Sequence, residues 1–120
     1  VPDCIYCEPQ VASVGLTEAK AREMGYAVKI GRFPFKASSK ASILSAEEGF
    51  IKLVCEEKYG EILGAHMIGP SVTELIAEVV MAMRLDGTAE DIMYTVHAHP
   101  TLAEAVFDAA NAVYSVTINA

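Results

Sequence analysis

Two apolar runs on either side of a short turn constrain the fold of this chain more than any other feature. Residues 50–55 and 61–68 are rich in Val, Ile, Leu and other apolar residues, and Lys58-Tyr59-Gly60 lies between them. Strand-length apolar runs separated by a few residues that include glycine are typical of an antiparallel hairpin. Three shorter segments with strand character precede it, at 5–7, 11–14 and 26–30, and Phe33-Pro34-Phe35 is expected to continue the third one past a break. The first half of the chain therefore predicts an antiparallel sheet.

Helical periodicity dominates the part of the chain that follows the hairpin. Residues 72–83 place one apolar stripe at helical spacing, made of Val72, Leu75, Ile76, Val79, Val80 and Met83. Ser71 and Glu74 have the spacing of a capping box at the start of this segment. Gly87 follows it, and glycine is the residue that most often ends a helix. We therefore predict one amphipathic helix that ends at Gly87.

Three more helices are predicted from the residues at their ends. Thr17 and Gly25 are the expected cap and stop of a short helix in the first half of the chain. Thr88 and Asp91 have the same cap spacing ahead of another short helix. A last helix is expected to begin at Thr101. Its predicted buried stripe consists of Leu102, Ala105, Val106, Ala109, Ala110 and Val113.

Length, element order and charge limit the class of protein. The 120 residues suit a single domain over 1–120, and strands ahead of helices predict an α+β fold, an antiparallel β-sheet with helices packed on one face. The formal net charge of −7 argues against nucleic-acid and membrane partners. Three cysteines without a disulfide framework favour a reducing compartment. Because the first residue is Val and no signal peptide is visible, we expect the chain to begin inside a longer protein.

The segment His99-Pro100-Thr101-Leu102-Ala103-Glu104 is the strongest candidate for chemistry. Capping-box spacing would put Glu104 at the third helical position, with its side chain tilted back toward His99. A carboxylate that accepts a ring N–H fixes the imidazole tautomer and favours the protonated ring. Pro100 keeps His99 out of the helix, because proline disfavours helical backbone before it. The pattern predicts an acid-base pair. The alternative is an ordinary helix start beside a surface histidine.

Other patterns that could carry chemistry are less specific. Cys4-x-x-Cys7 and His97-Ala98-His99 together suggest zinc, but the two cysteines would face opposite sides of a strand and no second pair follows. We therefore predict no metal site and expect Cys4, Cys7 and Cys55 to be small buried residues. His66 is expected to be a packed or half-exposed strand residue. No two of the eight glycines have the spacing that begins a GxGxxG fingerprint.

Five motifs spread over the chain carry a resemblance to a known family. They are Val1-Pro2, Ile5-Tyr6-x-x-Pro9-x-Val11-Ala12-Ser13-Val14-Gly15, Gly49-Phe50-Ile51-Lys52, Leu63-Gly64-Ala65-His66-Met67-Ile68-Gly69-Pro70 and His97-Ala98-His99-Pro100-Thr101-x-x-Glu104. Over essentially its whole length the chain resembles the C-terminal interface, or dimerisation, domain of the pyridine nucleotide–disulfide oxidoreductases. The last motif is the most specific, and its doubled histidine favours the dihydrolipoamide dehydrogenases within that family. Cys4 and Cys7 depart from the residues usual at their positions.

This resemblance implies a part in a larger enzyme. Such a domain builds a homodimer, and its histidine reaches the redox disulfide of the other subunit. By that match His99 would be the acid-base catalyst for the thiols of dihydrolipoamide, Glu104 would orient it, and His99-Pro100 would lie close to the FAD of the partner subunit. Domains that hold FAD and NAD are expected upstream, so the chain alone should be inactive and bind neither cofactor tightly. The implied compartment is the cytoplasm of a bacterium or the mitochondrial matrix.

Two alternatives stay open. The first is the interface domain of another disulfide reductase, because glutathione reductases share the HPTxxE core of the last motif. The second is a free-standing dimerisation module with no catalytic role. Assays with dihydrolipoamide and with glutathione disulfide would separate the two enzymes, and a long upstream region with a glycine-rich fingerprint would argue against the module.

Overall fold

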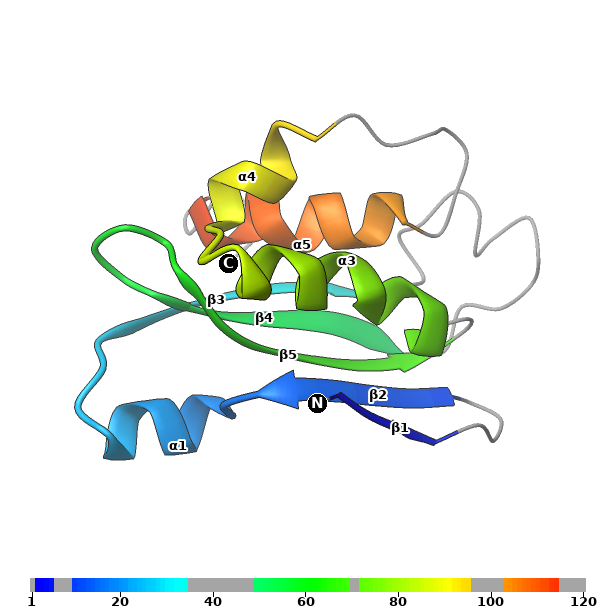
Figure 1. The fold of residues 1–120 in the computed structure, drawn as a ribbon, viewed down its shortest axis with the longest axis horizontal. Helices are drawn as coiled ribbons and strands as arrows, with labels where there is room; N and C mark the ends of the chain where they lie inside the picture. The colour runs from blue at the N-terminus through cyan, green and yellow to red at the C-terminus, as the bar shows by residue number, and fades with distance from the viewer. Residues whose placement is uncertain (1, 6–9, 35–48, 70–71, 96–102, 115–120) are drawn as a thin grey trace.

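The computed structural model describes residues 2–5, 10–34, 49–69, 72–95 and 103–114. Its strands form one antiparallel five-stranded sheet with the order β1-β2-β5-β4-β3 (Figure 1). The strands are β1 (Asp3–Ile5), β2 (Gln10–Gly15), β3 (Val28–Pro34), β4 (Phe50–Glu56) and β5 (Ile62–Gly69). The helices are α1 (Glu18–Glu23), α3 (Val72–Arg84), α4 (Ala89–Met93) and α5 (Glu104–Tyr114). The predicted α+β fold with an antiparallel sheet is confirmed.

Strands β4 and β5 form the predicted hairpin at the centre of the sheet. Leu53 pairs with Ala65, and the backbone N–H of Glu56 donates to the carbonyl of Glu61 at 2.8 Å across the turn. A register shift between Val54 and Cys55 marks a bulge, which increases the local twist. The pairing places the most apolar strands between their neighbours, where both edges of each strand are hydrogen-bonded.

The other strands begin or end a few residues from their predicted positions. Strand β1 comes earlier than the predicted segment 5–7, whose residues 6 and 7 lie outside the described part of the chain. Strand β3 starts two residues after the predicted residue 26 and runs on to Pro34, which pairs with Phe50, so the predicted continuation through residues 33 and 34 is confirmed. Strand β3 is an edge strand, where proline is tolerated.

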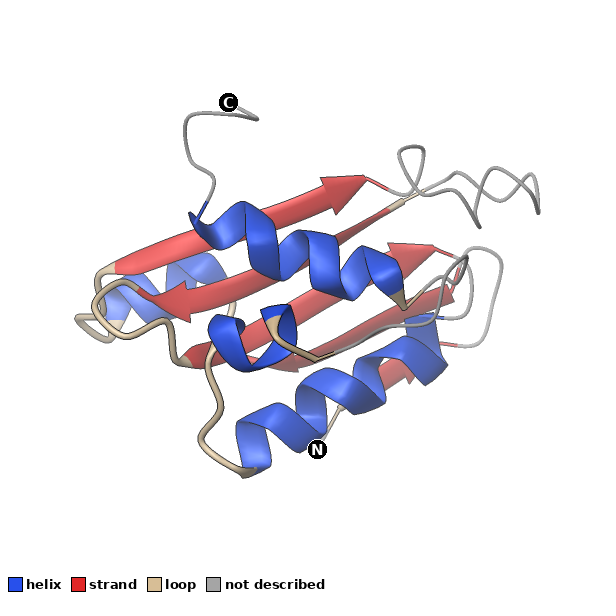
Figure 2. Ribbon diagram, turned by 90° about the horizontal axis from the view of Figure 1, so that it is seen from above, coloured by secondary structure: helices blue, strands red, loops and turns tan. Residues whose placement is uncertain are grey.

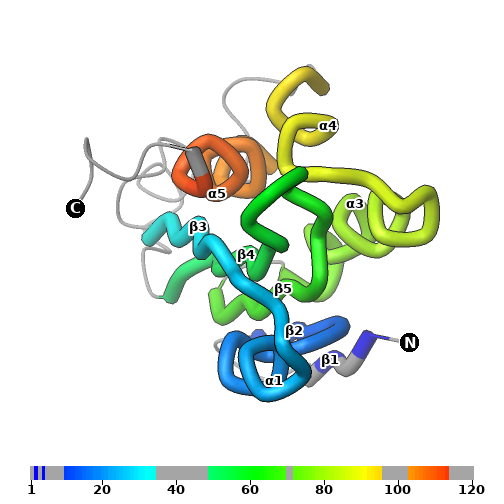
Figure 3. Tube along the Cα trace, turned by 90° about the vertical axis from the view of Figure 1, so that its left-hand side faces the viewer, coloured from blue at the N-terminus to red at the C-terminus, as the bar shows by residue number. Residues whose placement is uncertain are grey.

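Helices α3 and α5 cover one face of the sheet, and α4 packs against α5 above it (Figures 1 and 2). The core between these layers includes Ile51, Leu53, Met67, Ile76, Val79, Val106 and Val113. Successive strand residues point to opposite faces, so Val54 packs on the other side of the sheet with Ala21 of α1 and with Val28. Figure 3 shows α1 well apart from α3 and α5. The predicted placement on one face therefore holds for the larger helices, while α1 covers a small second cluster.

Threonine side chains cap the two short helices as predicted. Thr17 Oγ1 accepts the backbone N–H of Lys20 at 3.1 Å at the start of α1. At α4, the N–H of Thr88 donates to Asp91 Oδ2 at 2.8 Å, and the N–H of Asp91 donates back to Thr88 Oγ1 at 3.4 Å. These bonds satisfy N–H groups that have no partner inside a helix.

Helix α3 ends in two successive backbone bonds of the Schellman type. The N–H of Asp86 donates to the carbonyl of Met83 at 3.1 Å, and the N–H of Gly87 donates to that of Ala82 at 2.6 Å. The helix ends next to Gly87, as predicted, but the left-handed residue is Asp86, with φ of 55°. Gly87 is required for another reason, because a Cβ there would lie 2.7 Å from the Ala82 oxygen.

Candidate functional site

Of the residues predicted to carry catalysis, Glu104 is the one that the structure describes. It is half-buried and is the first residue of α5. His99 and Pro100 lie outside the described residues, as do His97 and Thr101. The predicted contact between Glu104 and the imidazole of His99 therefore stays a prediction, and so does the predicted position of His99-Pro100 beside a flavin.

The start of α5 differs from the sequence prediction. The described helix begins at Glu104 instead of Thr101, and the carbonyl of Ala103 accepts the N–H of Val106 at 3.0 Å and that of Phe107 at 3.4 Å. The shorter bond spans three residues, which is the geometry of a tight first turn. Glu104 thus occupies the first helical position and not the third, so the predicted capping-box position was wrong. A carboxylate in the first turn still interacts favourably with the helix dipole.

Helix α5 holds Glu104 on a rigid support. The predicted stripe is buried from Ala105 to Val113, and Leu102 lies outside the described residues. The helix approaches β3 closely at Gly31, where a Cβ would overlap the carbonyl oxygen of Ala109 and lie 2.6 Å from Val113 Cγ2. The small alanines of α5 allow this close packing, and the glycine opposite them completes it.

His66 has a structural role on the opposite face of the sheet. Its Nε2 lies 3.0 Å from the carbonyl oxygen of Leu16, and a carbonyl can only accept, so Nε2 carries the hydrogen. Lys52 pairs with His66 across the strands and donates to Glu18 Oε1 at 3.0 Å. The Lys52 bond, helped by Arg22, lowers the pKa of the Glu18 carboxyl. Both contacts hold the start of α1 to the sheet, and the prediction that His66 is a half-exposed strand residue is confirmed.

The described cysteines differ in exposure. Cys55 is fully buried, and burial raises the pKa of its thiol to about 12, so it does not ionise near neutral pH. The prediction of a buried apolar role is therefore confirmed for Cys55, whereas Cys4 is only half-buried and Cys7 lies outside the described residues. Within the described ranges, no three His, Cys, Asp or Glu side chains are grouped closely enough to bind a metal. The helices of the described chain are also too short or too polar to cross a membrane.

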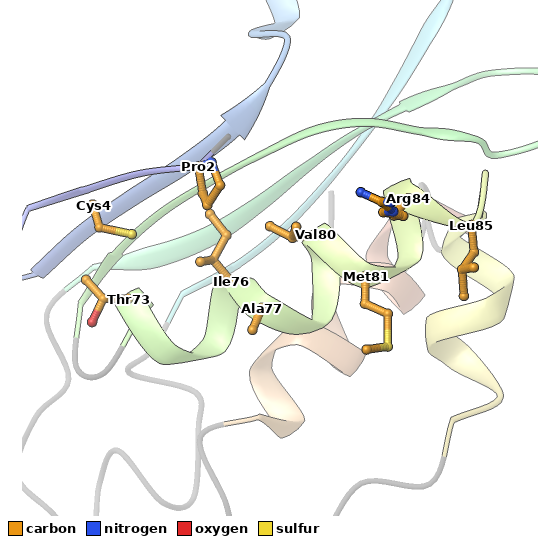
Figure 4. A pocket seen from close by; sticks show the side chains of 9 residues that line it. All are labelled: Pro2, Cys4, Thr73, Ile76, Ala77, Val80, Met81, Arg84 and Leu85. Carbon is orange, nitrogen blue, oxygen red and sulfur yellow. The ribbon is translucent and has the colours of Figure 1, made fainter.

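A groove of about 680 Å³ lies between the edge strand β1 and helix α3 (Figure 4). Its lining is almost wholly apolar, with Arg84 as the one charged side chain among Pro2, Cys4, Thr73, Ile76, Ala77, Val80, Met81 and Leu85. In Figure 4 Ala77, Met81 and Leu85 follow one another along α3 and the residue after it, while Cys4 comes from β1 and Pro2 from the residue before it. The groove is thus an apolar surface along the outer side of α3.

This surface was not predicted from the sequence, because the prediction for α3 contained one apolar stripe. The exposed residues of α3 are Glu74, Ala77, Met81 and Arg84, with Leu85 directly after the helix. Their spacing of three and four residues is also a helical stripe. The signal that indicates this surface is the four-residue spacing of Ala77, Met81 and Leu85.

Comparison with known proteins gives the family. The sequence matches "Pyridine nucleotide-disulphide oxidoreductase, dimerisation domain" over residues 1–110. The dihydrolipoyl dehydrogenase of Rhizobium etli is 50% identical over 120 residues, which is 100% of this chain and 25% of that enzyme. The mitochondrial dihydrolipoyl dehydrogenase of Pisum sativum is 42% identical over 119 residues, 99% of this chain and 24% of the enzyme. The chain spans about a quarter of the length of these relatives, which include bacterial and mitochondrial proteins.

A solved structure supports the same family. The HOCl-induced flavoprotein disulfide reductase RclA from Escherichia coli superposes with a TM-score of 0.88 and 26% sequence identity, over 92% of this chain and 26% of that one. The resemblance inferred from the sequence motifs is therefore confirmed both by the family match and by the fold.

Proposed function

Because the chain belongs to the dimerisation-domain family of the pyridine nucleotide-disulphide oxidoreductases, we propose that it is the dimerisation domain of a dihydrolipoyl dehydrogenase. In this proposal two copies form a homodimer, and His99 with Glu104 supplies acid-base catalysis to the redox disulfide of the partner subunit. The observation that carries the proposal is the 50% identity to a dihydrolipoyl dehydrogenase over the full 120 residues. The proposed compartment is the bacterial cytoplasm or the mitochondrial matrix.

The groove beside α3 does not fit FAD or NAD. The groove beside α3 is apolar, with one cation, and the sequence lacks the GxG spacing that lets a backbone approach a pyrophosphate. The proposal therefore assigns both cofactors to the other three-quarters of an enzyme of the relatives' length. On this assignment the chain by itself binds neither cofactor tightly and is inactive.

The proposed chemistry of His99 follows from the reaction of thiols with disulfides. The thiolate, and not the thiol, attacks a disulfide sulfur. His99 accepts the proton of one dihydrolipoamide thiol, and the resulting thiolate attacks one sulfur of the disulfide, whose other sulfur leaves as a thiolate. The second substrate thiol passes its proton to the enzyme thiolate that has left, and its sulfur attacks the substrate sulfur of the mixed disulfide. The enzyme sulfur of that bond leaves and takes up the proton held by His99, which yields the substrate disulfide and the enzyme dithiol. Glu104 favours the protonated imidazole and so strengthens the base.

The test uses the full-length enzyme that carries this chain. His99→Gln should lower kcat/KM for dihydrolipoamide by about 100-fold or more, as for the loss of a general base. His97→Gln is the matched control, because it removes the neighbouring imidazole of the same doubled-histidine motif, and it should leave turnover close to normal. Turnover near the wild-type value in His99→Gln would remove His99 from the mechanism.

Glu104→Gln tests the positioning role separately. Without the carboxylate the pKa of His99 falls, so the acidic limb of the kcat/KM profile should move to lower pH, with a loss of about 10-fold at neutral pH. A merely structural role for Glu104 would lower the activity equally at every pH.

A second candidate function is that of another disulfide reductase, which the similarity to a flavoprotein disulfide reductase favours. The full-length enzyme should oxidise dihydrolipoamide and fail to reduce glutathione disulfide if the first proposal is right. The reverse result would select the second.

A further inference from the structure

Helix α4 is the last described element before the segment that carries His99. It spans only five residues, Ala89–Met93, and its C-cap is Tyr94. An isolated helix of this length is not stable in water, because too few hydrogen bonds form to offset the cost of the first turn. The position of α4 therefore depends on contacts with other elements and on the bonds at its two ends.

The start and one side of α4 are fixed by neighbouring elements. The backbone N–H of Ala89 donates to the carbonyl of Gly60 at 2.9 Å, and the N–H of Ile62 donates to the carbonyl of Gly87 at 3.1 Å. These two bonds join the start of α4 to the turn between β4 and β5. Ala89 and Ile92 are buried in the core cluster that α4 shares with α5 (Figure 1). The start of α4 thus has a fixed position relative to the sheet and to α5.

The end of α4 is fixed by Thr95. Its Oγ1 donates to the carbonyl of Asp91 at 2.7 Å, and its backbone N–H donates to the carbonyl of Ile92 at 3.1 Å. Thr95 is exposed, so its methyl group adds little packing. Asp91 also binds the start of the helix, because its carboxylate accepts the N–H of Thr88 at 2.8 Å. A chain of hydrogen bonds therefore runs through Asp91 from the start of α4 to Thr95.

Thr95 is four residues before His99. A change in the direction of the chain at Thr95 displaces the residues that follow it, by an amount that grows with distance. Four residues span up to about 14 Å, and a rotation of roughly 10° displaces a point at that distance by roughly 2 Å. A misplacement of about 1 Å can cost about 100-fold in rate. The direction in which the chain leaves α4 therefore affects any reaction that uses His99.

We propose that Thr95 is a positioning residue for His99, because its hydroxyl bond to the Asp91 carbonyl sets the direction in which the chain leaves α4. This inference rests on the proposed acid-base role of His99 and deepens it. Thr95 takes no part in the proton transfer itself. It keeps the imidazole in the productive position for a larger share of the time, and the rate of dithiol oxidation is proportional to that share.

The test removes the hydroxyl bond in the full-length enzyme that carries this chain. Thr95→Val replaces the hydroxyl with a methyl group of similar size and should lower kcat/KM for dihydrolipoamide about fivefold. Thr95→Ser keeps a hydroxyl that can donate to the Asp91 carbonyl and should stay within about twofold of the wild-type value. A normal Thr95→Val, or equal losses in Thr95→Val and Thr95→Ser, would overturn the proposal.

A double variant separates positioning from a general structural effect. Because Thr95 acts through His99, Thr95→Val should lower the residual kcat/KM of His99→Gln by less than about 1.5-fold, since no imidazole is left to position. A structural defect would instead lower kcat/KM about fivefold in both backgrounds, and that result would also overturn the proposal.

The control is Thr17→Val, which removes a threonine bond from the other short helix, α1, on the opposite face of the sheet. It should speed hydrogen exchange at the Lys20 amide and leave kcat/KM unchanged. The single variant His99→Gln separates this inference from the proposed function. A fully active His99→Gln refutes the proposed function, and Thr95 then has no imidazole to position. A strongly impaired His99→Gln beside a normal Thr95→Val refutes only the role of Thr95.

Discussion

Helices α3 and α5 lie on the same face of one sheet, yet their side chains are buried to different degrees. Every side chain described on α5 is buried or half-buried, and its backbone approaches β3 at Gly31. Helix α3 buries one stripe and exposes a second one with Met81. Both helices are long and amphipathic, so helix propensity does not explain the difference. What differs is the set of described elements around them: α5 has β3 and β4 below it and α4 above it, whereas the groove on the outer side of α3 is bordered by the short edge strand β1.

This difference separates the residues that stabilise the fold from those that do not. The inner stripe of α3 and the buried stripe of α5 contribute to the stability of the chain, because they lose water when the chain folds. The outer stripe of α3 stays largely exposed and contributes little. Mutations on the two sides of α3 should therefore change the stability by very different amounts.

The largest expected effect comes from the inner side of α3. Ile76→Ala removes a side chain that is 2% exposed and should lower the free energy of unfolding by about 4 kcal/mol. Met81→Ala on the outer side removes a side chain that is 67% exposed and should change it by less than about 0.5 kcal/mol. Equilibrium urea unfolding of a dilute chain measures both values. Equal losses at the two positions would contradict the distinction between the two sides.

The close approach of α5 gives the next largest effect. Gly31→Ala should cost about 3 kcal/mol, because the new methyl group meets the backbone of Ala109 and cannot be relieved by a side-chain rotation. Gly25→Ala is the matched control. Gly25 has open space around its Cβ position but a φ of 96°, so it should cost only about 1 kcal/mol through backbone strain. A smaller loss at Gly31 than at Gly25 would mean that α5 does not rest on β3 as described.

The start of α3 is held by a residue from another element. Gln10 of β2 accepts the backbone N–H of Thr73 at 3.3 Å and its hydroxyl at 2.7 Å, both on Oε1. Gln10→Ala should lower the free energy of unfolding by about 1 kcal/mol, the usual value for a lost helix cap. Gln10→Glu keeps both acceptor contacts and should retain the stability. Hydrogen exchange at the Thr73 amide would localise the change to the first turn of α3.

The smallest expected effect lies on the opposite face, where Lys52 and Arg22 lower the pKa of the Glu18 carboxyl. A carboxyl with a lowered pKa in the folded state adds stability above the ordinary value of 4.5, and this stability is lost as the pH falls through the folded-state pKa. Since the Glu18 side chain is 36% exposed, Glu18→Gln should cost less than about 0.5 kcal/mol at pH 7 and almost nothing at pH 3. An equal loss at both pH values would mean that packing, and not charge, joins α1 to the sheet.

Local signals predicted much of the fold. The turn at Lys58-Tyr59-Gly60, the Thr17 cap and the Thr88–Asp91 box each act over a few residues, and the structure contains all of them. The buried stripes of the two large helices were also predicted, because burial of one face requires helical spacing of apolar residues. The start of α5 was less predictable, since a threonine followed three residues later by a glutamate has the spacing of a cap whether or not the helix begins there.

The sequence by itself determined the antiparallel sheet, the helices and their inner faces, because hydrogen-bonded turns, caps and apolar periodicity depend on residues close together in the chain. It also determined the family, since the motifs around His66 and His99 are short, continuous stretches of sequence. The tertiary structure alone decided that Gln10 caps a helix 63 residues away, that Gly31 lets α5 approach the sheet closely, and that Met81 and Leu85 are left exposed. These features depend on which residues far apart in the sequence come into contact. Such contacts form only when the chain packs, so no short segment of the sequence specifies them.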